Sequence, residues 1–381
     1  AAPFCGALLA DFGADVVKVE PPTGDSLRYM GPDVDGRGLW YGVENRNKKS
    51  ICIDLKSNAG KEILARLIRE ADVMTENFRP GVLAKLGFPW EKIHELNPRL
   101  ILARMSGYGQ TGPYADRAGY DRIGVGMGGL SFLTGDPKGP PTKPGVSSAD
   151  YFVGYSTAFG IMVALHEREK SGMGQELDVA LFEPVFRIME FTALHYDLTG
   201  TIRQRVGNSF AGTIPSGHFQ TKDGKWVSIA VGNDKLFKTL CERIGRMDWL
   251  ERPEFKTNNL RNENRKELDD YTEKWINEHT FRECFDLLGK HVPFGPIYDI
   301  EGIFQDEHYA ARNDIVEVSD DKWGKVHMQG VVPKLSRTPG EVRWSGPDLG
   351  KHTEEVLQSI GYSAEEVVKY CAEGSVISLK K

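Results

Sequence analysis

The sequence predicts an α/β protein with a Rossmann-like large domain, built on a parallel sheet, and a smaller α+β domain. Three observations predict this class. The chain has 381 residues, of which 40% are hydrophobic, so it is longer than one small core requires. Short apolar segments alternate with helical patterns from Ala14 to Ser106. After Thr199 the composition changes to a link that contains Gly, Ser and Pro.

The first part of the chain supplies the elements of the parallel sheet. A helical pattern that begins at Ala7 ends at Gly13, a residue typical of helix C-termini. Ser57 is the predicted N-cap of a helix whose apolar face is formed by Ile63, Leu64, Leu67 and Ile68. Strands are predicted at residues 14–20, 50–55, 72–78 and 100–106. Strands separated by helices of this length form a parallel sheet that is covered on both faces.

The rest of the chain predicts one long helix, a small domain and a return to the large domain. The long helix extends from Asp150 to Glu169, and residues 205–217 form the link. Two strand-like segments joined by a turn at Asp223–Gly224 precede several charged helices, and two further helices end the chain. We therefore expect a large domain at residues 1–200, a small α+β domain at 217–315, and a return segment with C-terminal helices at 316–381.

Composition and charge exclude several classes of protein. The net charge of -6 argues against a nucleic-acid partner or an anionic membrane, since both select broad basic surfaces. No segment approaches the roughly 18 apolar residues of a membrane span, and no signal segment is expected. The five cysteines are scattered and do not cluster with histidines, which predicts reduced thiols, no metal site and a cytoplasmic protein.

Residues 107–112, GYGQTG, have the G-x-G-x-x-G spacing of a dinucleotide-binding loop and follow a predicted strand. That fingerprint needs a helix that begins at the last glycine and an acidic residue about 20 residues later. Here Gly112 precedes Pro113 and a segment without a helical apolar stripe, and no strand ending in Asp or Glu follows at the required distance. The spacing therefore does not predict NAD binding.

Basic residues gather at the predicted ends of strands and helices in the first domain, although the chain is acidic overall. One interpretation is a solvated charged face. The other is a binding site for a phosphate-rich small cofactor, because ligands of α/β sheets bind at strand ends. These residues are Asn45–Lys49, Lys56, Arg79, Lys85 and Arg104.

Six segments, in order along the chain, strongly resemble the family III CoA-transferases. That family includes formyl-CoA transferase, carnitine CoA-transferase and the related α-methylacyl-CoA racemases. The segments are PFCGALLADFGADVVKVEPPTGD, NRNKKSICIDLK, ADVMTENFRPGVLAKLGF, NPRLILARMSGYGQTGPY, GPIYDIEGIFQDEHYAAR and GPDLGKHTEEVLQSIG. The resemblance covers essentially the whole chain. It implies a Rossmann-like large domain, a small domain, and a homodimer in which two chains interlock as rings.

The resemblance also implies the substrates and the residues that hold them. An acyl-CoA and a free carboxylic acid are the expected substrates, with no tightly bound cofactor. In relatives the large domain binds CoA, and a position matching Tyr108 lies beside the thioester. Other active-site residues of the family precede the position of Ala1. The matching CoA-binding residues are Arg46, Leu55, Lys56, Asn77, Phe78, Arg79, Lys85 and Tyr108.

Asp150 is the candidate catalytic residue. From the sequence alone, an Asp before an apolar helix is usually an N-cap, which accepts hydrogen bonds from free backbone amides. The resemblance implies a nucleophile that attacks the donor thioester to give an aspartyl anhydride and then an aspartyl-CoA thioester. The two interpretations are compatible, because the positive end of a helix favours the ionised carboxylate that a nucleophile requires.

Two alternatives to CoA transfer are an acyl-CoA racemase and a non-catalytic acyl-CoA binder. Racemase relatives carry a histidine in an A-G-H-D segment as a second base, whereas this sequence has Tyr120 in AGYD. A tyrosine with its ordinary pKa near 10 is a poor base at neutral pH, so packing is the alternative role for Tyr120. Asp150 argues against a pure binder. We therefore expect a CoA-transferase.

Overall fold

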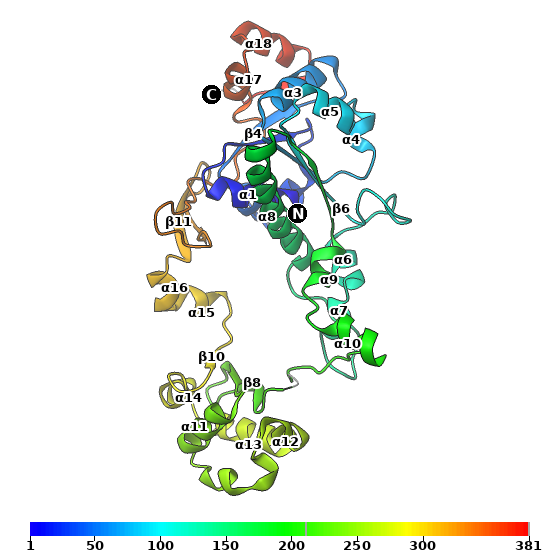
Figure 1. The fold of residues 1–381 in the computed structure, drawn as a ribbon. Coiled ribbons are helices and arrows are strands. Elements are labelled where there is room, and N and C mark those ends of the chain that lie inside the picture. Colours follow the sequence, from blue (N-terminus) through cyan, green and yellow to red (C-terminus); the bar gives the residue numbers. More distant parts are fainter. Residues whose placement is uncertain (210–211, 380–381) are drawn as a thin grey trace. The chain divides into compact units, whose positions relative to one another are not determined.

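The computed structural model describes residues 1–209 and 212–379, which form two compact units (Figure 1). The large unit contains Ala1–Phe132, Thr142–Arg203 and Arg312–Lys381, and the small unit contains Leu133–Pro141 and Gln204–Ala311. The small unit thus contains residues 133–141 and 204–311, whereas the sequence analysis expected 217–315, of which 312–315 belong to the large unit. Two positions of the expected link, 210 and 211, lie outside the described residues.

The large unit contains two three-stranded sheets. In the first, β1 (Val16–Glu20) runs parallel to β4 (Lys48–Ile53), and β13 (Val376–Ile377) pairs antiparallel with β4. In the second, β5 (Val73–Glu76), β6 (Ile101–Ser106) and β7 (Glu176–Ala180) are all parallel. The mixed α/β class with parallel strands is confirmed, and each of the four predicted strands is present, but these strands divide between two sheets and do not form the single parallel sheet that was predicted. The strands β7 and β13 were not predicted.

One face of the second sheet is covered by α3 (Asn58–Glu70), α4 (Val82–Lys85) and α5 (Trp90–Leu96). The hydroxyl of Ser57 accepts a hydrogen bond from Gly60 N at 2.9 Å, so the predicted N-cap is confirmed. Such a cap contributes about 1 kcal/mol. Ile63 and Leu67 of the predicted apolar face of α3 pack in the core cluster of the first sheet, whereas Leu64 and Ile68 pack in a cluster with strand β6. The buried members of this cluster are Leu64, Ile68, Leu83, Phe88, Ile93, Leu100 and Leu102.

The opposite face of this sheet is covered by α1 (Ala2–Asp11) and α8 (Ser148–Ser171) (Figure 1). Alternate residues of β6 point to opposite faces, so Ala103 and Met105 pack on the α8 side. The helices α1 and α8 touch at Gly154, where an added Cβ would lie 2.6 Å from Phe4 Cδ1. The absence of a side chain there lets the first turns of the two helices lie side by side.

The C-terminal helices α17 (Thr353–Ser359) and α18 (Ala364–Ala372) pack on the first sheet, in a cluster with Ile51 and Ile53. Residue His352 precedes α17, and its Nδ1 accepts a hydrogen bond from Ser50 N at 3.1 Å. His352 N donates to Ser50 O at 2.9 Å. Residues 312–381 thus belong to the large unit, and His352 lies at the start of α17.

Shorter elements complete the large unit. They are η1 (Ser26–Tyr29), β2 (Asp33–Val34), β3 (Arg37–Gly38), α2 (Leu39–Glu44), α6 (Asp121–Met127), α7 (Leu130–Leu133, whose last residue belongs to the small unit), α9 (Phe182–Arg187), α10 (Thr192–Thr199), β11 (Ile315–Asp320) and β12 (Gly324–Gln329). The strands β11 and β12 form a hairpin that the sequence analysis did not predict.

The small unit is an α+β body around a three-stranded antiparallel sheet in the order β10-β9-β8. The predicted turn at Asp223–Gly224 joins β8 to β9, with Gly224 in the left-handed region at φ +78°. Trp249 is fully buried and stacks on Phe237 at a centroid distance of 6.1 Å. The elements are β8 (Ser216–Gln220), β9 (Trp226–Ala230), α11 (Asp234–Ile244), η2 (Met247–Glu251), η3 (Pro253–Phe255), α12 (Asn258–Glu263), α13 (Arg265–Glu278), α14 (Phe281–Leu288), β10 (Phe294–Pro296), α15 (Ile300–Gln305) and α16 (Glu307–Ala311).

Across the described residues, no helix combines the length and the apolar character that crossing a membrane requires.

Candidate active site

Asp150 is the third residue of α8, not its N-cap. The helix begins at Ser148, and Ser147 occupies the N-cap position without a capping hydrogen bond from its side chain. Among the hydrogen bonds of the described residues, no backbone amide donates to Asp150. The side chain of Asp150 is 31% exposed. The interpretation of Asp150 as a helix cap is therefore wrong.

A different carboxylate caps α8. Asp121 Oδ1 accepts a hydrogen bond from Ala149 N at 2.8 Å, although 28 positions separate the two residues. Asp121 is the first residue of α6 and is buried. Lys143 Nζ lies 3.0 Å from Asp121 Oδ2. The sequence analysis considered only Tyr120 of the AGYD segment, and the acid beside it was the signal that it missed.

The surroundings of Asp150 raise its pKa. Burial is the main cause, and the negative charge of Asp121 acts in the same direction. The ammonium of Lys143 acts in the opposite direction. A raised pKa makes an ionised carboxylate more basic, which favours nucleophilic attack.

The residue after Asp150 fixes the first turn of α8 to α2. The hydroxyl of Tyr151 donates to Glu44 Oε1 at 2.9 Å, and Glu44 is buried. The ring of Tyr151 also meets the ring of Phe4 edge-on at 4.7 Å. The backbone that carries Asp150 is thus held on both sides, by α1 and by α2.

The glycine loop after β6 is a closed loop and not a dinucleotide fingerprint. A Cβ on Gly107 would lie 2.7 Å from the Cα of Gly119, so the two ends of the loop touch. In the described chain the helix that follows begins at Asp121 and not at Gly112. The ring of Tyr108 is half-buried and meets Tyr114 edge-on. Tyr120 is 80% exposed, so it does not pack within this chain.

The expected CoA-binding residues separate into two groups. Those that follow β4 and β5 lie at the C-terminal ends of parallel strands, where α/β proteins bind ligands. In this group Lys56, Asn77, Phe78, Arg79 and Lys85 are exposed, and Leu55 is half-buried against the core. Within the part of the chain that the structure describes, Lys56, Arg79 and Lys85 form no ion pair. Their charges face solvent.

Arg46 belongs to the second group and does not face solvent. Its Nε donates to Asp11 Oδ1 at 3.1 Å, its Nη2 contacts Asp11 Oδ2, and its Nη1 donates to the carbonyl of Gln329 at 2.6 Å. The neighbouring Lys48 is also buried and donates to the carbonyls of Pro3 and Glu44. This arrangement speaks against Arg46 as a phosphate ligand, because each of its three nitrogens already donates a hydrogen bond inside the protein.

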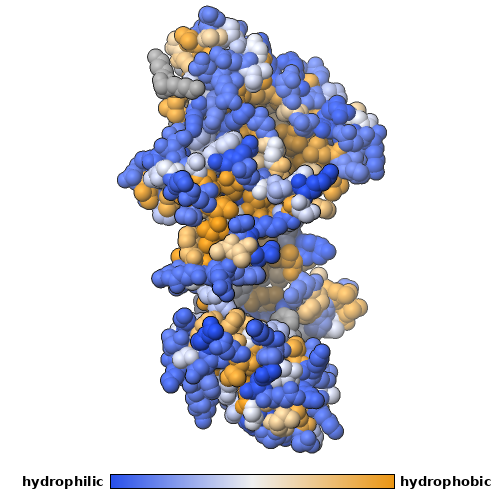
Figure 2. Space-filling view, turned by 90° about the vertical axis from the view of Figure 1, so that its left-hand side faces the viewer, coloured by the Kyte–Doolittle hydropathy of each residue, from blue (hydrophilic) through white to orange (hydrophobic). Residues whose placement is uncertain are grey.

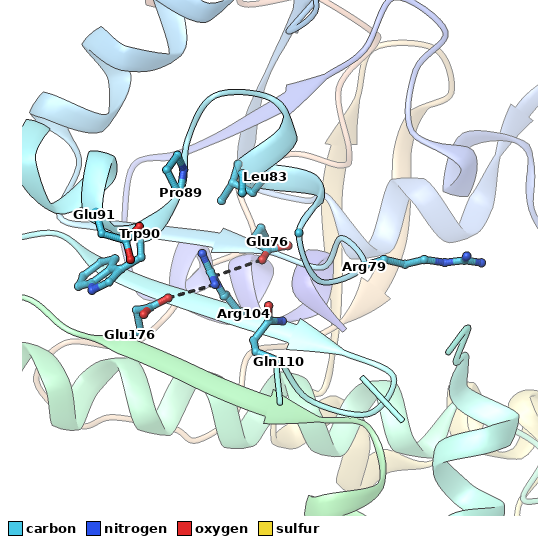
Figure 3. Close-up of a pocket in the computed structure, with 11 residues that line it drawn as sticks. Glu76, Arg79, Leu83, Pro89, Trp90, Glu91, Arg104, Gln110 and Glu176 are labelled. Carbon is cyan, nitrogen blue, oxygen red and sulfur yellow. Dashed lines mark ion pairs between the residues drawn. The ribbon is translucent and has the colours of Figure 1, made fainter. Parts of the chain in front are cut away.

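A cavity of about 260 Å³ opens beside strands β5, β6 and β7 (Figure 3). Arg104 lies between Glu76 and Glu176, at 3.6 Å and 3.2 Å, while the side chain of Arg79 points away from this pair. Burial raises the pKa of both glutamates. Glu91 adds a third carboxylate, and Asp150 does not line this cavity. The cavity is therefore not the site of the nucleophile.

No group of three or more His, Cys, Asp or Glu side chains suited to a metal ion exists among the described residues. The fold and site together define a mixed α/β protein. It has a carboxylate in the first turn of a long helix that does not cap this helix, and exposed cations at strand ends.

Comparison with known proteins assigns this arrangement to a family. The family model of CoA-transferase family III matches residues 1–353. Succinyl-CoA--D-citramalate CoA-transferase from Chloroflexus aurantiacus is 44% identical over 363 residues, with 94% of this chain and 90% of the relative covered. The beta subunit of succinyl-CoA--L-malate CoA-transferase from the same organism is 43% identical, with the same coverage.

A solved structure agrees with this assignment. The crystal structure of a CAIB/BAIF family protein from Brucella suis has a TM-score of 0.83 and 35% sequence identity, and the match covers 94% of this chain and 95% of that one. The chain belongs to CoA-transferase family III. It is a CoA-transferase, as the sequence analysis predicted.

Proposed function

We propose that this enzyme transfers CoA from succinyl-CoA to a second dicarboxylic acid, with Asp150 as the covalent nucleophile. The observation that carries the mechanism is the carboxylate of Asp150, which lies in the first turn of α8 and does not cap it. Two relatives above 40% identity are named as succinyl-CoA transferases for citramalate and malate, which supports the class of donor and acceptor.

The reaction proceeds in four steps that balance without water or a net proton. The Asp150 carboxylate attacks the thioester carbonyl, the C–S bond breaks, and CoA leaves as a thiolate from a mixed anhydride. The thiolate attacks the aspartyl carbonyl, and the donor acid leaves as a carboxylate. The acceptor carboxylate then attacks the aspartyl-CoA thioester and releases the thiolate. Attack of this thiolate on the acceptor carbonyl gives the new acyl-CoA and regenerates Asp150.

The strand-end residues form the binding site for CoA in this proposal. Lys56, Arg79 and Lys85 supply positive charge for the phosphates, and charge-assisted hydrogen bonds to phosphates are the stronger kind. Phe78, which is 40% exposed, offers a ring face to the adenine. Asn77 and Leu55 flank these groups, and Tyr108 lies on the thioester side. Arg46 is left out of this site because it is paired with Asp11.

A coupled assay with a panel of donors and acceptors tests the proposed reaction. Succinyl-CoA with malate, citramalate, glutarate and acetate should yield new thioesters from the dicarboxylic acids and little from acetate. The same reactions in deuterium oxide report exchange at the α-carbon. Exchange of the α-proton without transfer to any acid would contradict the proposal and favour the racemase. Transfer to acetate alone would refute the dicarboxylate class but not the mechanism.

A homodimer of interlocked chains is the second part of the proposal. Tyr155, Phe159, Met162 and Val163 form an exposed apolar stripe on α8, with Phe159 72% exposed. Leu194 and Leu198 on α10 are 62% and 73% exposed. On the face that Figure 2 shows, apolar side chains also lie among polar ones. Apolar side chains exposed in such number on a single chain mark protein interfaces, and a second copy of the chain is the occupant that the family resemblance implies.

Light scattering after size-exclusion chromatography tests this part independently of activity. The parent protein should elute as a dimer, and tagged and untagged dimers should not exchange chains until they are unfolded. Phe159→Glu should weaken dimer formation, whereas Val368→Glu on α18, also an exposed apolar position, should not. A monomeric parent protein, or rapid exchange of chains, would contradict the interlocked dimer.

A further inference from the structure

The side chain of Ser147, the N-cap residue of α8, makes no capping hydrogen bond. The acid Asp121, on another helix, accepts a hydrogen bond from the first turn instead. We propose that Asp121 is a positioning residue of CoA transfer: it holds the backbone that carries Asp150, and with Lys143 it sets the charge around that nucleophile. This inference rests on the proposed role of Asp150.

The contact between Asp121 and α8 is short and protected from solvent. The hydrogen bond from Ala149 N to Asp121 Oδ1 is 2.8 Å long, and the side chain of Asp121 is 10% exposed. Ala149 directly precedes Asp150. The helices α6 and α8 are packed closely at this point, since a Cβ on Gly124 would lie 2.9 Å from Ala149 Cβ. A displacement of Asp121 would therefore displace the turn that carries Asp150.

Lys143 links the same carboxylate to the loop that enters α8. Its Nζ lies 3.0 Å from Asp121 Oδ2 and donates to the carbonyls of Val146, at 2.7 Å, and Pro144, at 3.1 Å. In the described part of the chain, Asp121 Oδ2 accepts no hydrogen bond of acceptable geometry, so the contact with Lys143 is one of charge. The ammonium of Lys143 thus fixes the loop that precedes α8 and compensates the negative charge of Asp121.

The two partners have opposite effects on the nucleophile. The charge of Asp121 disfavours ionisation of Asp150, and the charge of Lys143 favours it. The other charged groups around Asp150 are the nitrogen of Ala1 on α1, at 3.5 Å, and Glu44 on α2, which is bonded to Tyr151. Neither changes when Asp121 or Lys143 is replaced.

The pH profile of kcat/KM for the acyl-CoA separates positioning by charge from simple support of the fold. Its acid limb reports the pKa of the nucleophile in the free enzyme. Asp121→Asn keeps an acceptor for Ala149 N and should move this limb to lower pH. Lys143→Met should move it to higher pH. Each shift should be on the order of one pH unit or less, and the double variant should return toward the parent profile.

Opposite shifts cannot arise from loss of the ion pair alone, because both variants lose the same pair. Shifts in the same direction, or no shift in folded variants, would overturn the inference. If Asp121→Asn fails to fold, Lys143→Met and Lys143→Arg provide the test. Lys143→Arg should keep the acid limb at its parent pH, and Lys143→Met should move the limb to higher pH. Asp150→Asn is measured alongside. Normal turnover of that variant refutes the proposed nucleophile, whereas its inactivity together with unmoved limbs refutes only the role of Asp121.

Discussion

Asp11 and Asp150 are carboxylates on two helices that pack against each other, yet their surroundings differ. Asp11 is 3% exposed and accepts hydrogen bonds from Arg46 and from Asn47 Nδ2 at 2.8 Å. The side chain of Asp150 is 31% exposed, and among the described residues no side chain donates to it. A buried acid with all its partners fixes the fold, while an acid without them remains available for chemistry.

The cations show the same contrast. Arg46 and Lys56 lie in one basic region of the sequence, but Arg46 is paired with Asp11 and Lys56 faces solvent. A phosphate can bind only to donors that the protein has left unused. The pairing of each charge, and not its position in the sequence, therefore indicates whether it serves structure or substrate.

The largest expected effect comes from exchanging the two acids for amides. Asp150→Asn should lower turnover by at least about a thousandfold, because an amide cannot form the anhydride. Its stability should change little, because Asp150 does not cap α8 and its side chain is 31% exposed. Asp11→Asn should instead lower the free energy of unfolding by about 3 kcal/mol, because Arg46 loses its buried partner. Steady-state kinetics and urea unfolding of both variants check this contrast, and comparable losses of stability would break it.

Arg46→Met should destabilise the protein by about 3–5 kcal/mol, because it leaves Asp11 buried without its main partner. In whatever fraction folds, the KM for the acyl-CoA should remain close to that of the parent. Urea unfolding and kinetics at saturating and limiting acyl-CoA provide the two measurements. A stable Arg46→Met variant with a raised KM would reinstate Arg46 as a CoA ligand.

Gly154→Ala tests the contact that places α1 beside the nucleophile. The added Cβ would lie 2.6 Å from Phe4 Cδ1, so the two helices must move apart, at a cost of about 1–3 kcal/mol. Gly126→Ala on α6 is the matched control, since a Cβ there meets nothing within 4 Å. Gly154→Ala should lower the midpoint temperature of thermal unfolding, and Gly126→Ala should not lower it. Equal effects would mean that the α1–α8 contact is not tight.

Lys56→Glu and Lys85→Glu should leave stability unchanged and raise the KM for the acyl-CoA roughly tenfold, the effect of losing one phosphate contact. The KM for the acceptor acid should not change, because the acid carries no phosphate. Lys274→Glu in the small unit, also an exposed lysine, serves as the control for added negative charge. Equal changes in the two KM values would mean that these lysines form only a solvated face.

The smallest expected effect concerns His352, whose pKa is lowered by burial. Its Nδ1 accepts from Ser50 N, which requires the neutral ring. Because the folded-state pKa lies below the ordinary value, this stabilisation is present above about pH 6.5 and is lost as the pH falls below it, with a slope of at most about 1.4 kcal/mol per pH unit. His352→Asn should reduce the loss of stability between pH 7.5 and 5.5, whereas His166→Gln on the exposed face of α8 should not. A parent-like pH dependence in His352→Asn would contradict this role.

The sequence predicted the features that depend on neighbouring residues. Ser57 caps α3 as expected, and the apolar runs that became β4 and β6 were identified from local patterns alone. The start of α8 was placed two residues too late, which is why Asp150 resembled a cap. The strand β7 was missed because its sequence, ELDVA, is short and places charges between its apolar residues.

Features that join distant parts of the chain could not be predicted in this way. Asp11, the partner of Arg46, lies 35 positions earlier in the sequence. Asp121, which caps α8, lies 28 positions before Ala149, whose amide donates to it. Sequence spacing carries no signal for such pairs, because tertiary packing alone brings them together. The candidate nucleophile was found through the family resemblance, whereas the group that positions it emerged from the geometry.

The central claim is that Asp150 becomes covalently activated during turnover, and trapping tests it most directly. Enzyme is incubated with succinyl-CoA and hydroxylamine, digested, and analysed by peptide mass spectrometry, with Asp150→Asn and an incubation without succinyl-CoA as controls. We predict a hydroxamate on the peptide that contains Asp150, formed only in the parent protein and only when the thioester is present. An active enzyme with an unmodified Asp150, or a hydroxamate on another carboxylate, would contradict the account.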